Sequence, residues 1–233
     1  MTKLIIFDLD GTLIDTMEDI AAACNHALEN CGCPVRRLDE YNMLVGRGID
    51  NLFRGALPED KKTEELVRKM RSLFVPYYNE HKCDFTHPYD GMMKTLDALS
   101  SRGIRLAVAS NKYQDGTEQL VRHFFGKYDF VKILGQRDGK PTKPDPEIVH
   151  EIMDGVPGIS LDEVVYCGDS DVDMQTAAYG GDFRYFRFIV CHNRRRAAGK
   201  QDVGTVVNCD VVGDVVNQRC LIPHVFKDFF PHK

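Results

Sequence analysis

Two aspartates that follow a short apolar run are the residues best suited to chemistry in this chain. The run, residues 4–7, is too short for a helix and typical of a buried strand, and Asp8 and Asp10 come directly after it. Two carboxylates so close together repel each other unless a cation lies between them, and oxygen ligands of high charge suit Mg²⁺. Gly11 permits a tight turn whose amides hold an anion. A turn that merely favours Asp and Gly is the alternative, but the string Asp-Leu-Asp-Gly-Thr after a strand is specific and favours a site.

A serine and a lysine further along the chain extend this pattern. Residues 104–109 form a second candidate strand, which leads into Ser110, Asn111 and Lys112. A serine at a strand end is more often a turn or cap residue than a phosphate ligand. Lys143 precedes Pro-Asp-Pro, an extended turn that enters a helix, and a lone lysine there is usually a solvated charge. Each of these two signals is weak when taken alone.

A third candidate strand ends in a cluster of acidic residues. Residues 164–167 lead into Gly-Asp-Ser-Asp-Val-Asp, so that Asp169, Asp171 and Asp173 lie within five residues. Three carboxylates after a buried strand are costly unless a metal ion or a lysine lies nearby. Because ligands bind at the carboxyl ends of the strands of an open parallel sheet, the four polar segments together predict one site.

The elements that position these residues alternate between short strands and amphipathic helices, which predicts an α/β fold. We expect a doubly wound, Rossmann-like parallel sheet. A helical stripe runs from Ile20 to Cys31, with Asp15 or Thr16 as its N-cap and Gly32 as its stop. A second stripe covers residues 66–81 and contains Pro76, which is expected to interrupt and kink it. Three later helices are expected, two ending near Gly103 and Gly126 and one around residues 148–153.

The long helical stretch divides the chain into two domains. Residues 15–87 contain no strand pattern and are expected to form a small helical cap domain, inserted after the first strand. Residues 1–14 and 88–233 are expected to form the α/β core, with residues 182–233 as an atypical C-terminal part.

Four motifs in this order resemble the haloacid dehalogenase superfamily of phosphatases, most closely its phosphoglycolate phosphatase branch. The motifs are Asp8-Leu-Asp-Gly-Thr12, Ser110-Asn-Lys112, Lys143-Pro-Asp-Pro146, and Gly168-Asp-Ser170 with Asp173. The resemblance covers about residues 1–180 and includes a helical cap between the first and second motifs.

The resemblance implies a role for each matching residue. Asp8 is the expected nucleophile, and Asp10 the acid that protonates the leaving oxygen and then activates water. Mg²⁺ is the implied cofactor, held by the Asp8 side chain, the Asp10 backbone carbonyl and Asp169. Asp173 is expected to orient Lys143 or a metal-bound water. The residues expected to hold the phosphoryl group are Thr12, Ser110, Asn111 and Lys143.

The implied reaction is hydrolysis of a small phosphomonoester resembling 2-phosphoglycolate, through an aspartyl-phosphate. Two alternatives stay open: a β-phosphoglucomutase-type phosphoryl transferase, and a catalytically impaired relative that only binds phosphoesters. Asp10 favours phosphomonoester chemistry, because dehalogenases and phosphonate-cleaving relatives lack an acid at this position. Thr12 favours hydrolysis, because the mutases usually carry Val there. Substrate choice is expected to come from the cap, where Arg47 in Gly-Arg-Gly is a candidate for pairing with a substrate carboxylate, or else a surface arginine on a glycine turn.

Composition excludes several other classes of protein. The 233 residues carry 30 Lys+Arg and 35 Asp+Glu, a net charge of −5, which argues against a nucleic-acid binder and an anionic membrane surface. The chain lacks an apolar run of the ~18 residues that a membrane span needs. It also lacks the long apolar region of a signal peptide, and its eight cysteines are scattered, so we expect reduced thiols and a cytoplasmic location. The expected partner is a small phosphorylated metabolite, with no nucleic acid and no membrane, and the expected assembly is a monomer or a homodimer.

The last part of the chain departs from the family pattern. Relatives continue with a short strand and a Trp-Gly turn, and this chain has no Trp. Residues 186–191 are expected to supply the strand, and residues 205–212 an edge strand. The cluster Arg194-Arg195-Arg196 is interpreted as a solvated loop rather than as a nucleic-acid or phosphate patch. Residues 182–233 are therefore either divergent or the product of a shifted reading frame.

Overall fold

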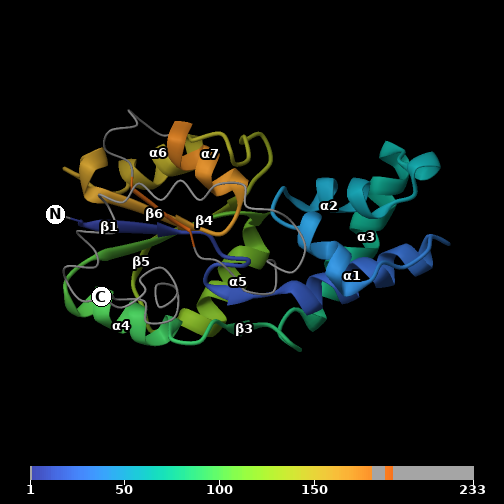
Figure 1. The fold of residues 1–233 in the computed structure, drawn as a ribbon, viewed down its shortest axis with the longest axis horizontal. Coiled ribbons are helices and arrows are strands. Elements are labelled where there is room, and N and C mark those ends of the chain that lie inside the picture. The colour runs from blue at the N-terminus through green and yellow to red at the C-terminus, as the bar shows by residue number, and fades with distance from the viewer. Residues whose placement is uncertain (1, 180–186, 191–233) are drawn as a thin grey trace, which may run out of the picture.

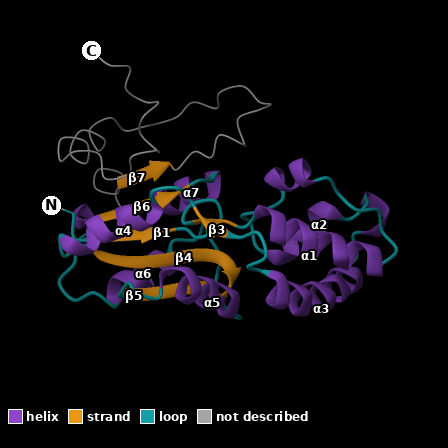
Figure 2. Ribbon diagram, turned by 90° about the horizontal axis from the view of Figure 1, so that it is seen from below, coloured by secondary structure: helices purple, strands orange, loops and turns teal. Residues whose placement is uncertain are grey.

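A parallel five-stranded sheet forms the centre of the larger domain. The computed structural model describes residues 2–179 and 187–190. Figure 1 shows the sheet edge-on, and Figure 2 shows it from below with its strands side by side. The strand order is β5-β4-β1-β6-β7, and every pair in it is parallel. The strands are β1 Leu4–Phe7, β4 Arg105–Tyr113, β5 Phe130–Gln136, β6 Val164–Gly168 and β7 Arg187–Val190. This topology confirms the predicted α/β fold.

Helices cover both faces of the sheet, as Figure 1 shows. On one face lie α4 (Met92–Ser101) and α5 (Gln114–Phe125), and on the other lie α6 (Glu147–Asp154) and α7 (Asp171–Tyr179). A short 3₁₀ turn, η3 (Leu161–Glu163), leads into β6.

The central strand, β1, is buried on both faces, and this explains its unbroken apolar sequence. Ile5 and Phe7 of β1 pack toward α4 and α5, whereas Leu4 and Ile6 pack toward α6, so alternate residues enter opposite cores. All four are buried.

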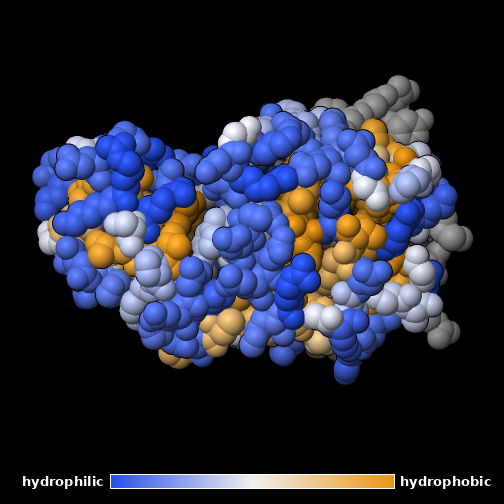
Figure 3. All heavy atoms as spheres, turned by 180° about the vertical axis from the view of Figure 1, so that it is seen from behind, coloured by the Kyte–Doolittle hydropathy of each residue, from blue (hydrophilic) through white to orange (hydrophobic). Residues whose placement is uncertain are grey.

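A second, helical domain packs around its own apolar core. We call it the cap, comprising α1 (Met17–Asn30), α2 (Ile49–Ala56), α3 (Glu64–His81) and the 3₁₀ turns η1 (Leu38–Met43) and η2 (Glu59–Lys61). Its largest buried residues are Tyr41, Phe53, Phe74 and Tyr78. Figure 3, a view from behind, shows two lobes with a constriction between them and a largely hydrophilic surface.

Two short strands carry the chain into the cap and out of it. β2 (Ile14–Asp15) and β3 (His87–Pro88) pair antiparallel, with Ile14 opposite Pro88 and Asp15 opposite His87. Asp19 of α1 reinforces this junction, because its buried carboxylate accepts hydrogen bonds from the backbone N–H groups of Phe85 and Thr86 and from the Thr86 hydroxyl. Both passages between core and cap therefore lie side by side.

Several element boundaries differ from the sequence prediction. The second core strand was expected over residues 104–109 but continues to Tyr113, because Tyr113 still pairs with Gln136 of β5. The helix α3 continues as one element through Pro76, which was expected to interrupt it. Thr16 is the N-cap of α1 by position, but its hydroxyl does not cap the helix; it bonds to Asp10 instead.

At the C-terminal end, β7 lies within the predicted 186–191 segment and pairs with β6. The predicted edge strand at residues 205–212 and the Arg194-Arg195-Arg196 cluster lie outside the described residues. None of the helices in the described part of the chain is long and apolar enough to cross a membrane.

Candidate active site

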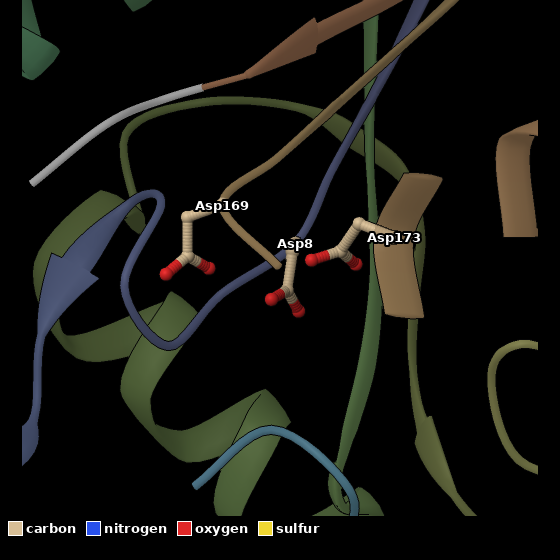
Figure 4. A group of neighbouring side chains, drawn as sticks. All are labelled: Asp8, Asp169 and Asp173. Atoms are coloured by element: carbon tan, nitrogen blue, oxygen red, sulfur yellow. The ribbon is translucent and has the colours of Figure 1, made fainter. Parts of the chain in front are cut away.

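Three carboxylates converge at the carboxyl edge of the sheet. Asp8 follows β1, Asp169 follows β6, and Asp173 lies in the first turn of α7. One carboxylate oxygen from each lies within 4.8 Å of the others, and Figure 4 shows Asp8 between Asp169 and Asp173. Parallel pairing of β1 with β6 places these strand ends together, which is why Asp8 and Asp169 meet here although they are 161 positions apart in the sequence.

The ammonium group of Lys143 neutralises part of this charge. Its Nζ atom lies 2.8 Å from Asp8 Oδ1 and 2.7 Å from Asp173 Oδ1, and all three side chains are buried. Asp173 also accepts hydrogen bonds from the hydroxyl of Tyr166 at 3.2 Å and from the hydroxyl of Ser170. Both oxygens of Asp173 therefore have partners within the protein, and its contact with Lys143 is compatible with the predicted role of orienting that lysine.

The pKa values of the two buried carboxyl groups, Asp8 and Asp173, shift in opposite directions. Burial, together with repulsion from Asp173 and Asp169, raises the pKa of Asp8 to about 8, although Lys143 opposes the shift. The pKa of Asp173 is lowered, because Lys143 and Ser170 together outweigh its burial. The carboxylates of Asp173 and Asp8 in turn raise the pKa of Lys143 and outweigh its burial, so Lys143 stays charged. Among the described residues, Lys143 is the one cation that pairs with Asp8, and it shares its charge with Asp173, so an ionised Asp8 is only partly compensated.

That charge deficit is what a divalent cation would supply. The donor set of Asp8 and Asp169 consists of carboxylate oxygens, which is the ligand chemistry that Mg²⁺ prefers. The carboxylate of Asp10 lies outside the three-carboxylate cluster. The assignment of its backbone carbonyl to a metal stays a prediction.

Gly11 makes room for Asp169. Its backbone has φ +86°, a conformation that side chains disfavour, and a Cβ atom at this position would overlap the Asp169 carboxylate. The glycine of the first motif therefore serves two purposes: it allows the turn after β1 and it lets a carboxylate from β6 approach that turn.

Asp10 has two partners that sequence reasoning missed. Lys112 Nζ lies 3.0 Å from Asp10 Oδ1 and 3.1 Å from Asp10 Oδ2, and the Thr16 hydroxyl donates to Oδ1 at 2.8 Å. The sequence analysis included Lys112 in the second motif but gave it no role. Its spacing from Ser110 could have indicated that it lies at the site, because residues two apart in a strand point to the same side.

The remaining predicted phosphate ligands lie at the same edge, with varied partners. Ser110 is buried, and its hydroxyl accepts a hydrogen bond from the backbone N–H of Lys112 at 3.1 Å. The hydroxyl of Thr12 lies 3.4 Å from Asp169 Oδ1. The side chain of Asn111 bonds to the backbone of Lys143 and to the Gly46 carbonyl, so it fixes two loops.

A cleft between core and cap opens onto these residues. The space within it is about 520 Å³ when the open solvent at its mouth is included. The core contributes a polar wall and the cap an apolar one; the lining residues are Asp8, Asp10, Ser110, Asn111, Lys112 and Tyr113 from the core, and Ile20, Val45, Gly46, Gly48, Ile49, Leu52, Phe74 and Tyr78 from the cap. Such a cleft suits a small ligand whose charged end faces the sheet.

Arg47 is the predicted site residue that the structure places apart from the others. Its neighbours Gly46 and Gly48 line the cleft, but Arg47 does not. Its guanidinium pairs with Asp171 at 2.6 Å, and both side chains are about 60% exposed. The contact joins the cap to the start of α7, and it gives Arg47 a protein carboxylate as partner.

Comparison with known proteins identifies the family. A phosphoglycolate phosphatase of Aquifex aeolicus is 32% identical over 181 residues, which cover 77% of this chain and 81% of that protein. One from Aliivibrio fischeri is 29% identical over 184 residues, covering 77% and 81%. The crystal structure of a predicted phosphoglycolate phosphatase from Haemophilus somnus superimposes with a TM-score of 0.73 at 28% identity, covering 81% of this chain and 84% of that one. The haloacid dehalogenase-like hydrolase family model matches residues 5–181, and the chain therefore belongs to the haloacid dehalogenase-like hydrolases.

Proposed function

We propose that the protein is a magnesium-dependent phosphatase that hydrolyses a small phosphomonoester resembling 2-phosphoglycolate through an aspartyl-phosphate. The observation that carries this proposal is the buried arrangement in which Lys143 bridges Asp8 and Asp173 while Asp169 faces Asp8. Phosphoryl transfer requires mainly positioning and charge neutralisation, and this arrangement supplies a carboxylate nucleophile beside a fixed cation.

In the first step a carboxylate oxygen of Asp8 attacks phosphorus. The new Asp8 O–P bond forms as the bond between phosphorus and the ester oxygen breaks, and Asp10 gives a proton to that leaving oxygen. In the second step Asp10 takes a proton from water, whose oxygen attacks phosphorus, and Asp8 leaves as the carboxylate. The proton that Asp10 donated is thereby restored.

Neighbouring groups prepare these residues for their roles. Lys143, which contacts Asp8, and Ser110, which lines the cleft, would hold phosphoryl oxygens at the edge of the sheet. Asp8 and Asp169 would hold Mg²⁺, which would neutralise the phosphoryl group and keep Asp8 ionised for attack. The cap lines the cleft from the other side and would limit the access of water to the reacting atoms.

The substrate proposal rests on the relatives and on the residues that line the cleft. Curated relatives carry the name phosphoglycolate phosphatase. The polar core wall and the apolar cap wall of the cleft suit a small metabolite with an anionic end. We further propose that the protein acts as a monomer or a homodimer in the cytoplasm.

The test is phosphate release from 2-phosphoglycolate and from p-nitrophenyl phosphate, with and without Mg²⁺. We expect turnover that depends on the metal, and its loss in Asp8→Asn. Asp171→Asn is the matched control, because Asp171 lies near the site but is exposed and pairs with Arg47, so this variant keeps its activity.

The covalent intermediate has its own test. Acid quenching during turnover of a radiolabelled substrate is expected to leave label on the wild-type protein and none on Asp8→Asn. Absence of turnover in the wild type would instead favour an impaired, phosphoester-binding relative. Transfer of the label to a sugar phosphate at the expense of water would favour a transferase.

A further inference from the structure

One cationic side chain lines the cleft, when only the described residues are considered. This residue is Lys112, near the end of β4, and its side chain is 6% exposed. Burying an ammonium group costs free energy unless it is paired, so the groups around Lys112 indicate what it interacts with. Among the described residues, Lys112 pairs with Asp10, whereas the proposed nucleophile, Asp8, pairs with Lys143.

The ammonium of Lys112 lies between the two domains. On the core side, it donates to the two carboxylate oxygens of Asp10 at 3.0 and 3.1 Å. On the cap side, it lies 4.7 Å from the centre of the Tyr78 ring, a cation–π distance. An ammonium has three N–H donors and Asp10 takes at most two of them, so a donor remains for a ligand oxygen.

Tyr78 offers a second donor at the same place. Its side chain is fully buried and lines the cleft, and its hydroxyl has no hydrogen-bond partner in the part of the chain that the structure describes. Burial, with Asp10 and Asp19 nearby, raises the pKa of Tyr78, so the hydroxyl keeps its proton. An unsatisfied buried donor is unfavourable unless a ligand accepts its hydrogen bond.

In the part of the chain that the structure describes, the other basic residues near the site are engaged elsewhere. Lys143 is held between Asp8 and Asp173, where the phosphoryl group is expected. Arg47 is exposed and paired with Asp171, off the lining of the cleft. A second anionic group on the substrate would therefore meet Lys112.

We propose that Lys112 and Tyr78 form the subsite that binds a carboxylate on the leaving group, which makes Lys112 the specificity-determining residue for anionic phosphomonoesters. This inference rests on the proposed phosphatase function. In 2-phosphoglycolate a single methylene joins the carboxylate to the ester oxygen. Since Lys112 and Asp10 are in direct contact, a carboxylate on Lys112 brings the ester oxygen next to the acid that protonates it.

The experiment compares two substrates that differ only in the second charge. Ethyl phosphate carries a methyl group where 2-phosphoglycolate carries its carboxylate. The quantity measured is the ratio of kcat/KM for 2-phosphoglycolate to kcat/KM for ethyl phosphate. Lys112→Met is expected to lower this ratio about 100-fold, the order of one charge-assisted hydrogen bond, with most of the change in KM for 2-phosphoglycolate. Lys112→Arg, which keeps the charge, is expected to restore most of the ratio.

Arg47→Ala is the matched control, because Arg47 was the candidate that the sequence offered for pairing with a substrate carboxylate. We expect its ratio to equal that of the wild type. The inference is overturned if Lys112→Met weakens both substrates equally, or if Arg47→Ala produces the selective loss instead. If Lys112→Met does not fold, as judged by its thermal transition, Lys112→Gln and Lys112→Arg supply the same comparison.

A different result would show that the proposed phosphatase function itself is wrong. In that case the wild type would release no phosphate from either substrate or from p-nitrophenyl phosphate with Mg²⁺ present. A wild type that hydrolyses both substrates with a ratio near one overturns the carboxylate subsite and leaves the phosphatase standing.

Discussion

The side chain of Asn111 holds the backbone of Lys143 at both of its hydrogen-bonding groups. Asn111 Oδ1 accepts from the Lys143 N–H at 2.8 Å, and Asn111 Nδ2 donates to the Lys143 carbonyl at 3.0 Å. The same amide nitrogen donates to the Gly46 carbonyl of the cap at 3.1 Å. A single residue of β4 thus fixes the loop that carries the catalytic-site lysine and anchors a loop of the cap.

Asn111→Ala is expected to destabilise the protein and to reduce turnover together. It leaves two buried backbone groups of Lys143 without partners, which costs about 3 kcal/mol in the free energy of unfolding. Urea denaturation measures that loss, and kcat is expected to fall because Lys143 loses its position. The control is Asn51→Ala, since the Asn51 amide bonds to the Arg47 carbonyl at an exposed site. An unchanged kcat in a folded Asn111→Ala protein would contradict the positioning role.

Gly11→Ala is expected to disable the site through Asp169. The new methyl group meets the Asp169 carboxylate and the backbone is strained at φ +86°. Gly103→Ala separates these two effects, because Gly103 also has positive φ, +70°, but nothing lies within 4 Å of the added atom. We expect both variants to lose about 1 kcal/mol from backbone strain. Only Gly11→Ala is expected to lose phosphatase activity and metal affinity, measured by steady-state rates and by calorimetric titration with Mg²⁺.

Metal binding is expected to weaken as pH falls below about 8. The pKa of Asp8, raised to about 8 by burial, means that the metal-free protein carries a proton there at pH 7. Mg²⁺ must displace that proton, so its Kd is expected to rise by up to about tenfold per pH unit below this value. Calorimetry in buffers of different ionisation enthalpy measures the released proton.

The same shift predicts how stability depends on pH without metal. A raised carboxyl pKa means that the folded state binds a proton that the unfolded state has released. The contribution of Asp8 is therefore favourable at low pH and is lost as pH rises through 8. Thermal melts in a metal chelator should show that loss in the wild type, and Asp8→Asn should lack it. A wild-type melting profile that is flat between pH 7 and 9 would refute this interpretation.

Lys143→Met is expected to destabilise the metal-free protein strongly. Asp8 and Asp173 would remain buried without their shared cation, which costs about 3–5 kcal/mol. The control is Lys140→Met on the same loop, because Lys140 is half exposed and pairs with Glu147 at the surface. We expect that change to stay within about 0.5 kcal/mol. Chemical denaturation with and without Mg²⁺ measures both, and equal losses in the two variants would contradict the charge argument.

The strands were predictable where burial alone decides them. β1 and β6 are apolar runs because both faces of the sheet are covered, and their observed ends agree with the sequence within one residue. β4 was not fully predictable. Its last residues, Ser110 to Tyr113, are polar and look like a strand end, yet pairing with β5 keeps them extended. That pairing is a tertiary effect, which local sequence does not contain.

The residues of the site that follow neighbouring parallel strands could be predicted, because the carboxyl ends of these strands lie at the same edge of the sheet. Asp8, Asp169, Asp173 and Lys143 meet as their positions at the sheet implied. The partner of Arg47 was beyond sequence reasoning, since Asp171 lies 124 positions away and the contact depends on how the cap packs against the core. The same is true of Tyr78 and Lys112, which meet only because α3 of the cap covers the end of β4.

The antiparallel pair of β2 and β3 makes the cap a replaceable module. Because Asp15 and His87 are opposite each other, the insertion begins and ends at one point on the core. A two-residue turn joining these strands would close the chain without disturbing the order of the parallel sheet. One contiguous segment of the gene therefore encodes the whole insertion, which can be exchanged without moving the carboxyl edge of the sheet.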